Sequence, residues 1–228
     1  TTSMLFSGSS FNGNISSWDV SSVTNMSNMF SHSQGFNSDI SAWDVSSVTD
    51  MSHMFRYAYT FNQDLNNWDV SSVTDMTHMF KFAHSFNQDL NNWDVSSVTD
   101  MSYMFSGSNG WYNTFNGDIS NWDVSSVTDM SYMFSETSDF NSFISNWDVS
   151  SVTNAVYMFR NADGFQGDLS DWCLPLITLR PFGFTYGTNG IVEPLWQDGD
   201  CDGFEVDLDC DDHNPLDASI AGDCDQDG

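Results

Sequence analysis

Tryptophan recurs through most of the chain at an almost constant interval. Successive positions are 25 residues apart, with a single interval of 29, and they are Trp18, Trp43, Trp68, Trp93, Trp122, Trp147 and Trp172. A fixed period of this length indicates a solenoid, because a repeat this short cannot form a core alone and must bury its apolar side on its neighbours. The sequence therefore predicts seven stacked coils over residues 1–172.

Each repeat has the same internal order. W-D-V-S-S-V-T is followed by a variant of D-M-S-x-M-F, a short variable stretch, and F-N-x-D-I/L-S-x before the next Trp. Val48, Met51 and Phe55 lie at helical or 3₁₀ spacing, whereas residues 39–45 alternate in polarity. We therefore expect a repeat solenoid of the α/β class, in which each coil has a short parallel strand and a short helical or 3₁₀ turn.

Two polar positions also recur once in each coil. The Asn after each repeat Phe, as at Asn37 and Asn62, is expected to form an internal ladder that satisfies backbone groups. The Asp after each repeat Trp, as at Asp44 and Asp94, is expected to accept hydrogen bonds from the following V-S-S backbone as an Asx-turn. A ladder of calcium ions along this Asp column is the alternative.

The repeat resembles a known family of surface proteins. W-D-V-S-S-V-T-D-M-S-x-M-F together with F-N-x-D-I-S-x-W resembles the BspA-like leucine-rich-repeat surface proteins, in the branch of the mycoplasma lipoproteins. The resemblance covers about residues 1–172. It implies a leucine-rich-repeat-like solenoid displayed outside the cell and often concerned with adhesion, and it implies no catalytic residues.

The charge balance narrows the range of partners. The chain has 32 acidic residues against 4 Lys and Arg, a formal net charge of −28. Nucleic-acid binding needs many cations to neutralise phosphates, so we expect no nucleic-acid partner. No apolar run has transmembrane length, so we expect no membrane insertion. Divalent cations are the natural partners of such a chain.

The cysteines and the end of the array divide the remaining chain. An even number of cysteines, few lysines and many Asn, Ser and Thr predict a secreted protein with disulfides, and the three possible pairings stay open for Cys173, Cys201, Cys210 and Cys224. After Trp172 the repeat degenerates into Leu174-Pro175-Leu176. We therefore expect a C-terminal cap and linker over residues 173–197, followed by an Asp-rich segment over 198–228.

The Asp-rich segment has the ligand spacing of a calcium loop. Asp198, Asp200 and Asp202 occupy positions 1, 3 and 5, Phe204 offers a carbonyl at position 7, and Asp209 falls at position 12. The segment resembles thrombospondin type-3-like repeats and the D-C-D-D-x-N-P motif of bacterial surface proteins. It is predicted to bind calcium, the alternative being a solvated acidic linker. Further ligand candidates are Asp207, Asp211, Asp212, Asp223, Asp225 and Asp227.

Two features point to ligand contacts. One position inside the predicted helical turn varies although its surroundings are constant, which indicates an exposed stripe made of Asn28, His53, His78, Tyr103, Tyr132 and Tyr157. The four-residue insertion within 106–114 places Trp111 and Tyr112 on a loop. These aromatic and His side chains are the candidates for contacting an extracellular protein or glycan. A merely amphipathic surface and local packing are the alternatives.

These features favour an extracellular cell-surface adhesion or binding module, a calcium-stiffened scaffold without catalysis. Catalysis needs a convergent constellation that is not repeated, and nearly every polar residue here recurs with the repeat. The alternative is a structural subunit of a surface filament or layer, with self-assembly by coil stacking. An ice-binding solenoid, suggested by threonines in register, and a hydrolase rank below both.

Overall fold

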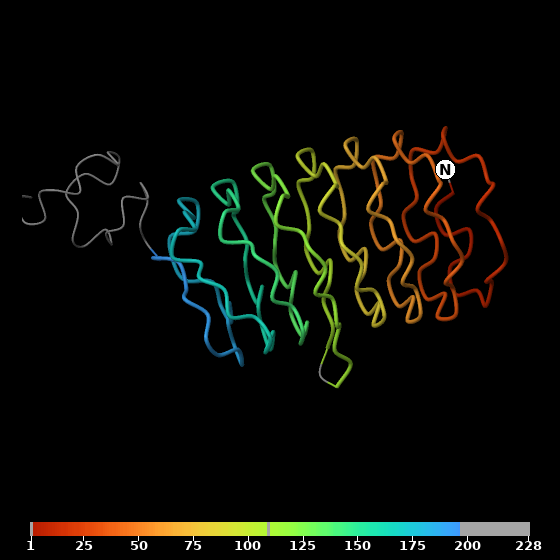
Figure 1. Cartoon of the computed structure of the whole chain (residues 1–228). Coiled ribbons are helices and arrows are strands. Elements are labelled where there is room, and N and C mark those ends of the chain that lie inside the picture. The colour runs from red at the N-terminus through yellow and green to blue at the C-terminus, as the bar shows by residue number, and fades with distance from the viewer. Residues whose placement is uncertain (1, 109, 197–228) are drawn as a thin grey trace, which may run out of the picture.

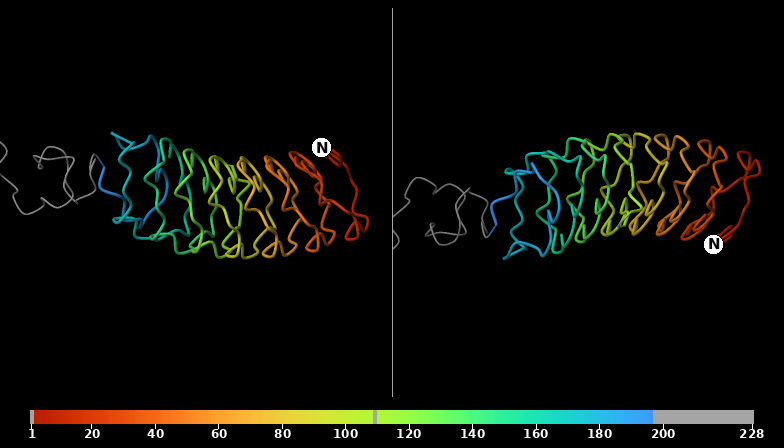
Figure 2. Two further views of the ribbon diagram at one scale, coloured as in Figure 1. Left: turned by 90° about the horizontal axis from the view of Figure 1, so that it is seen from above. Right: turned by 90° about the horizontal axis from the view of Figure 1, so that it is seen from below.

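The chain winds into coils that stack in file along one axis, as Figures 1 and 2 show from three directions. The computed structural model describes residues 2–108 and 110–196. The first coil lies at one end of the stack, and residues 180–196 lie at the other. Each coil spans one sequence repeat, so residues 25 apart occupy equivalent places. The rings of Trp122 and Trp147, for example, stack with their centroids 6.2 Å apart.

The described residues form no helix and no continuous strand. The prediction of an α/β solenoid, with a parallel strand and a helical or 3₁₀ turn in each coil, is therefore wrong. Accordingly, the described part of the chain holds no helix long and apolar enough for a bilayer span. Single-residue parallel bridges take the place of a sheet, and the longest series joins Asn25, Asp50, Asp75, Asp100, Asp129 and Asn154 in successive coils.

Overlapping turns replace the predicted helix. The amide of Met29 donates to the carbonyl of Met26 in the same coil at 3.1 Å, whereas the amide of Asn28 donates to Ser52 in the next coil at 2.9 Å. This alternation continues to residue 33, with every second N–H directed at the neighbouring coil. An α-helix would direct each N–H to the residue four before it. Apolar residues three or four apart thus face inward from turns.

The other sides of the coils are joined by equally regular hydrogen bonds. The amide of Thr49 donates to the carbonyl of Thr24 at 2.9 Å, and its hydroxyl donates to the same oxygen at 3.2 Å. The amide of Asn37 donates to Oδ1 of Asn12 at 2.9 Å. The asparagines do form the predicted ladder, but it is exposed and not internal. Repeated backbone groups are thus satisfied without a sheet.

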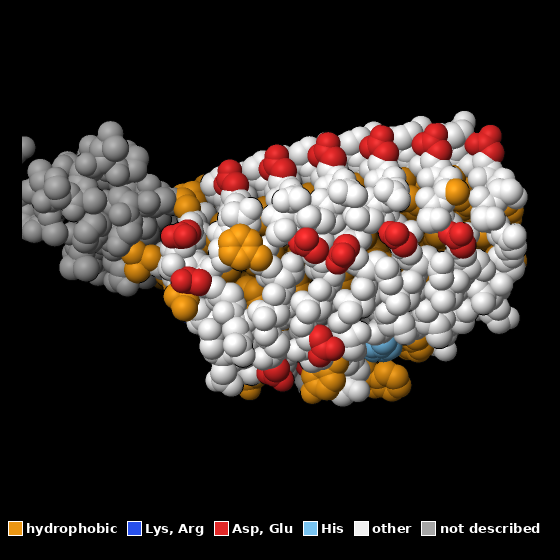
Figure 3. Space-filling model, in the orientation of Figure 1, with side chains coloured by type: hydrophobic (Ala, Val, Ile, Leu, Met, Phe, Trp, Pro, Cys, Tyr) orange, Lys and Arg blue, Asp and Glu red, His pale blue; other side chains and the backbone are white. Residues whose placement is uncertain are grey.

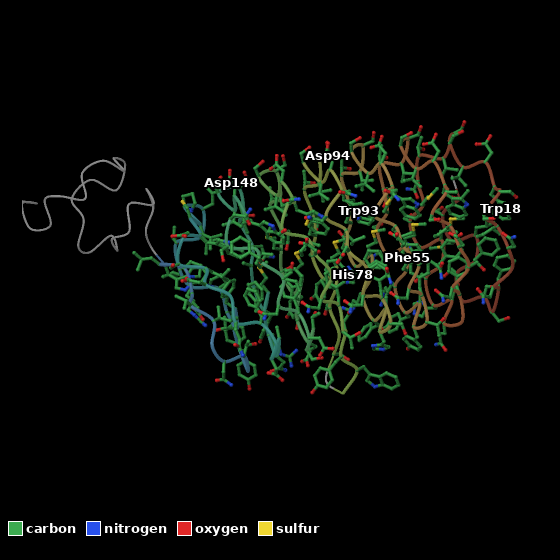
Figure 4. The ribbon with its side chains drawn as sticks, in the orientation of Figure 1. Trp18, Phe55, His78, Trp93, Asp94 and Asp148 are labelled. Atoms are coloured by element: carbon green, nitrogen blue, oxygen red, sulfur yellow. The ribbon has the colours of Figure 1, made fainter. Side chains whose placement is uncertain are left out.

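Phenylalanine dominates the interior of the stack. Within one coil the rings of Phe55 and Phe61 lie 4.0 Å apart and nearly parallel, and Phe55 lies 5.5 Å from Phe80 of the next coil. The indole N–H of Trp93 donates to the carbonyl of Leu65 in the preceding coil at 2.8 Å. Figure 4 shows Phe55 and Trp93 inside the stack. Because the phenylalanine ring contacts recur from coil to coil, the core is continuous along the axis.

Residues 173–196 continue the same pattern at the end of the stack. The amide of Phe159 donates to the carbonyl of Phe184 at 2.8 Å, and Phe184 is fully buried. The guanidinium of Arg180 forms an ion pair with the carboxylate of Glu193 at 2.5 Å. The hydrogen bond to Phe159 joins this segment to the preceding coil, and the ion pair lies within the segment itself.

Candidate ligand-binding face

The predicted calcium ligands, from Asp198 to Asp227, lie outside the described residues. So do three of the four cysteines, and the disulfide pairing stays a prediction. Within the described residues, no group of three or more His, Cys, Asp or Glu side chains is arranged to hold a metal ion. A candidate site in the described part of the chain must therefore be sought among other side chains.

The column of Asp residues after the tryptophans serves the corners of the coils. Oδ1 of Asp94 accepts hydrogen bonds from the amide of Ser96 at 3.1 Å and from its hydroxyl at 2.6 Å. The predicted Asx-turn is therefore confirmed. The Ser hydroxyl and amide hydrogen bonds also lower the pKa of the equivalent Asp44. These carboxylates form an exposed row along one edge, where Figure 3 shows them in red and Figure 4 labels Asp94 and Asp148.

The variable position forms one continuous column of rings. Neighbouring ring centroids lie 4.4 to 4.9 Å apart along His53, His78, Tyr103, Tyr132 and Tyr157. The side chains are half-buried, and not exposed as the sequence suggested. Their φ angles lie between 57° and 59°, in the left-handed region and outside any right-handed helical turn. The structure thus brings these five predicted contact residues together.

A second and a third column, which the sequence analysis missed, lie beside the first. The rings of His32, Tyr57 and Phe82 stack at 4.5 Å in the second column. In the third, Tyr59 and His84 lie 4.9 Å apart. Tyr57 and Tyr59 connect the two columns with centroids 6.1 Å apart. We call the three columns, together with the insertion-loop residue Trp111, the aromatic face.

The insertion loop extends the third column outward. The Trp111 side chain is 60% exposed, and its ring lies 5.9 Å from His84 and 6.3 Å from Tyr59. Asn113 anchors the loop, because its side-chain amide donates to the carbonyl of Phe80 at 3.0 Å. The loop projects below the stack in Figure 1. Tyr112, which is also exposed, has a carbonyl 2.6 Å from Nδ1 of His84.

Three of the four Lys and Arg residues of the chain lie on this face. The Lys81 ammonium lies 3.9 Å from the ring centroid of Tyr103 and 5.5 Å from that of Phe82. The Arg56 guanidinium lies 4.9 Å from the centroid of Tyr57. Arg160 lies 5.6 Å from the Tyr157 ring and forms an ion pair with the buried Glu136 at 3.4 Å. Such positions over ring faces are cation–π contacts.

Partial burial lowers the pKa values of the His side chains in the first two columns of the aromatic face and of the Lys81 side chain beside them. The pKa of His78 is lowered to about 3, mainly by burial. Burial is also the main cause that lowers the pKa of His53. Both rings are therefore neutral at pH 7, and the positive charge comes from the other side chains. Burial, assisted by repulsion from Arg56, lowers the pKa of Lys81 to about 8, so most of its ammonium groups stay charged at pH 7.

Several buried nitrogens on the aromatic face have no hydrogen-bond partner among the described residues. They are Nδ1 of His53 and of His78, Nε of Arg56 and Nε2 of His84. Buried polar atoms in proteins are usually paired, since leaving one unpaired costs about 1–3 kcal/mol. The unpaired atoms gather on two adjacent coils, next to Lys81. This part of the face therefore combines unpaired nitrogens with positive charge.

The missed residues did leave a signal in the sequence. Tyr57 and Phe82 are 25 residues apart, as are Tyr59 and His84, and both pairs fall in the variable stretch that follows M-F. Aromatic residues at constant spacing within a variable stretch predict a stacked column, just as they do at His53 and His78. The position of Trp111 beside that column required the structure, because the insertion breaks the spacing.

The comparisons with known proteins concern the repeat itself. A family model described as "Mycoplasma protein of unknown function, DUF285" matches residues 1–113 and 111–179. No match was found among the curated proteins or among the solved structures. Since the two matched ranges together cover most of the chain and nearly all of the coil stack, the chain belongs to the DUF285 family of repeat proteins.

Proposed function

We propose that this chain is an extracellular, cell-surface binding module without catalytic activity, and that its aromatic face contacts a glycan or protein. The aromatic face is the observation that carries the proposal. Most other positions of the coil repeat the same residue, whereas the face varies from coil to coil and holds most of the cations. The resemblance of the repeat to BspA-like surface proteins supports a location outside the cell.

The repeated polar groups support a scaffold role for the rest of the surface. The Asp94 carboxylate is engaged by Ser96, and the Thr49 hydroxyl by the carbonyl of Thr24. The side-chain oxygen of Asn37 accepts the amide of Asn62 at 2.9 Å. Side chains held in this way stabilise the corners of the coils, because they satisfy local backbone groups.

We also propose that residues 198–228 bind calcium and stiffen the junction to whatever adjoins the stack. The alternating carboxylates of Asp198, Asp200 and Asp202 support this proposal, since calcium takes six to eight oxygen ligands.

Binding arrays of glycans and extracellular proteins test the proposed function. The wild-type chain is compared with the Tyr59→Ala/Trp111→Ala variant, which removes two rings of the aromatic face. The control is Phe143→Ala, because Phe143 is 64% exposed and makes no ring contact with this face within the described residues. We expect the double variant to lose binding that the control retains. Equal binding by both variants, or no binding by the wild type, would contradict the proposal.

A further inference from the structure

Two cations of the aromatic face, Arg56 and Lys81, have no acidic partner among the described residues, although the chain is rich in Asp and Glu. The sequence has 32 acidic residues for 4 Lys and Arg, yet neither Arg56 nor Lys81 forms an ion pair with any residue in 2–108 or 110–196. Within the same ranges, Arg160 is paired with Glu136 and Arg180 with Glu193. The two unpaired cations occupy equivalent positions in adjacent coils, linked by the amide of Tyr57, which donates to the carbonyl of Lys81 at 2.9 Å.

The arrangement is unfavourable in the absence of a ligand. Both side chains are half-buried, Nε of Arg56 has no hydrogen-bond partner among the described residues, and the two like charges repel each other. Burial and this repulsion are what lower the pKa of Lys81 to about 8. An anion placed between the two charged groups would offset their repulsion and accept charge-assisted hydrogen bonds, which are strong where the cations are partly desolvated.

Further rings adjoin the cations without forming a flat surface, because Phe82 meets His84 edge to face at 64° and Tyr57 meets Tyr59 at 72°. From Lys81 the rings continue through Phe82 to His84, with centroids 6.2 Å apart, and on to Trp111 at 5.9 Å. From Arg56 they continue through Tyr57 to Tyr59. Trp111 ends this series with a side chain that is 60% exposed, and the negative potential of an indole face attracts the C–H groups on the apolar side of a sugar ring. A ligand that has both a carboxylate and a sugar face matches this arrangement.

We propose that the aromatic face binds an acidic glycan, with a sugar carboxylate between Arg56 and Lys81 and a neighbouring sugar ring on Trp111. This inference rests on the proposed function and specifies the class of its ligand. The guanidinium donates two parallel hydrogen bonds to a carboxylate, and the ammonium supplies a second positive charge. No bond is made or broken.

Charge favours an isolated carboxylate over an extended anionic surface. A chain with a net charge of −28 is repelled by an anionic membrane or a strongly acidic peptide, and two cations are too few to overcome a high charge density. A glycan with single carboxylates spaced along neutral sugars avoids this repulsion. Its neutral sugars also supply the faces that the rings can contact.

The presence of a single lysine allows a direct test in the intact chain. Reductive methylation with ¹³C-formaldehyde labels only Lys81 and the α-amino group, which serves as the internal reference. The labelled chain is titrated with a sialylated trisaccharide, a glucuronic-acid-containing disaccharide and the neutral lactose. We expect a saturable shift of the Lys81 methyl signal with an acidic sugar and no such shift with lactose.

Variants then locate the carboxylate and the sugar ring. We expect Arg56→Gln to weaken binding of the acidic sugar about tenfold to hundredfold, as the loss of charge-assisted hydrogen bonds predicts. Arg56→Lys is expected to restore part of the affinity, which shows that the face is still folded. Ser22→Asp makes the same change in net charge away from the aromatic face, and we expect it to have little effect. Trp111→Ala is expected to weaken binding through loss of the sugar contact.

The outcomes separate this inference from the proposed function. Equal affinity for acidic and neutral sugars, or binding only to poly-glutamate or to phosphatidylserine vesicles, would overturn the acidic-glycan inference. The proposed function would survive if the partner still required Tyr59 and Trp111. If no glycan shifts Lys81 and no protein on the arrays requires the aromatic face, both proposals fail.

Discussion

Replacing Tyr132 by Gly and by Ala distinguishes overlapping turns from the helical turn that the repeat spacing suggests. Tyr132 has φ = 57°, in the left-handed region. A side chain there costs about 1–2 kcal/mol relative to Gly. Against this, Gly lowers the free energy of unfolding by about 0.4–1 kcal/mol relative to Ala, because it makes the unfolded chain more flexible. The difference leaves Tyr132→Gly more stable than Tyr132→Ala by about 0–1.6 kcal/mol, with a central value of about 0.8 kcal/mol.

The stability that is lost with the tyrosine ring is the same in both variants, so it cancels from the difference between them. Both variants remove the ring that stacks 4.4 Å from Tyr103 and 4.9 Å from Tyr157, so both are expected to be less stable than the wild type. In a helix the order of the two variants would be reversed, with Ala about 1 kcal/mol more stable than Gly. The sign of the difference therefore tests the backbone conformation directly.

Chemical denaturation followed by tryptophan fluorescence measures the difference. Ser22 is the matched control, because it is exposed, lies in the turn closed by the amide of Val23 and the carbonyl of Val20, and has no positive φ. We expect Ser22→Ala to be more stable than Ser22→Gly. If Ala were more stable than Gly by about 1 kcal/mol at position 132, as in a helix, the left-handed column would be refuted.

Three further changes have expected outcomes. Trp93→Phe should destabilise the chain by about 1–2 kcal/mol more than Trp147→Phe in thermal denaturation, since Nε1 of Trp93 donates to Leu65 whereas Nε1 of Trp147 has no partner among the described residues. The Arg180 hydrogen bond lowers the pKa of Glu193 from 4.5 to about 2, so its stabilisation is complete above pH 4.5 and disappears as the pH falls through 2. Glu193→Gln should therefore lower the melting temperature at pH 7 but not at pH 2; an equal effect at both would contradict the pairing. Asp200→Asn/Asp202→Asn should weaken calcium binding in calorimetry, and unchanged affinity would exclude the proposed ligands.

The constant residues of the repeat predicted the stacking of the coils but not their backbone conformation. Stacked Trp and paired Phe rings follow from the period alone, since each coil needs its neighbours to bury them. The predicted helix was wrong because Met26, Met29 and Phe30 have the spacing of a helix and of overlapping turns alike. Hydrogen bonds distinguish the two, and their partners lie in another coil.

Part of the candidate site followed from the sequence as well. The column from His53 to Tyr157 was recognised because a single position varied while its neighbours did not. The unpaired state of Arg56 and Lys81 could not be recognised in the same way. In a chain with so many acidic residues, the sequence alone gives every cation a potential partner, and only the distances show which cations have none.

Protection of Lys81 from acetylation tests the central claim, that the aromatic face is the surface by which this chain binds its partner. The chain is treated with an amine-selective acetylating reagent alone and with a saturating amount of any partner found on the arrays, and the modified peptides are measured by mass spectrometry. We predict that the bound partner slows acetylation of Lys81 severalfold and leaves the α-amino group unchanged. Acetylation of Lys81 at the same rate with and without a bound partner would contradict the claim.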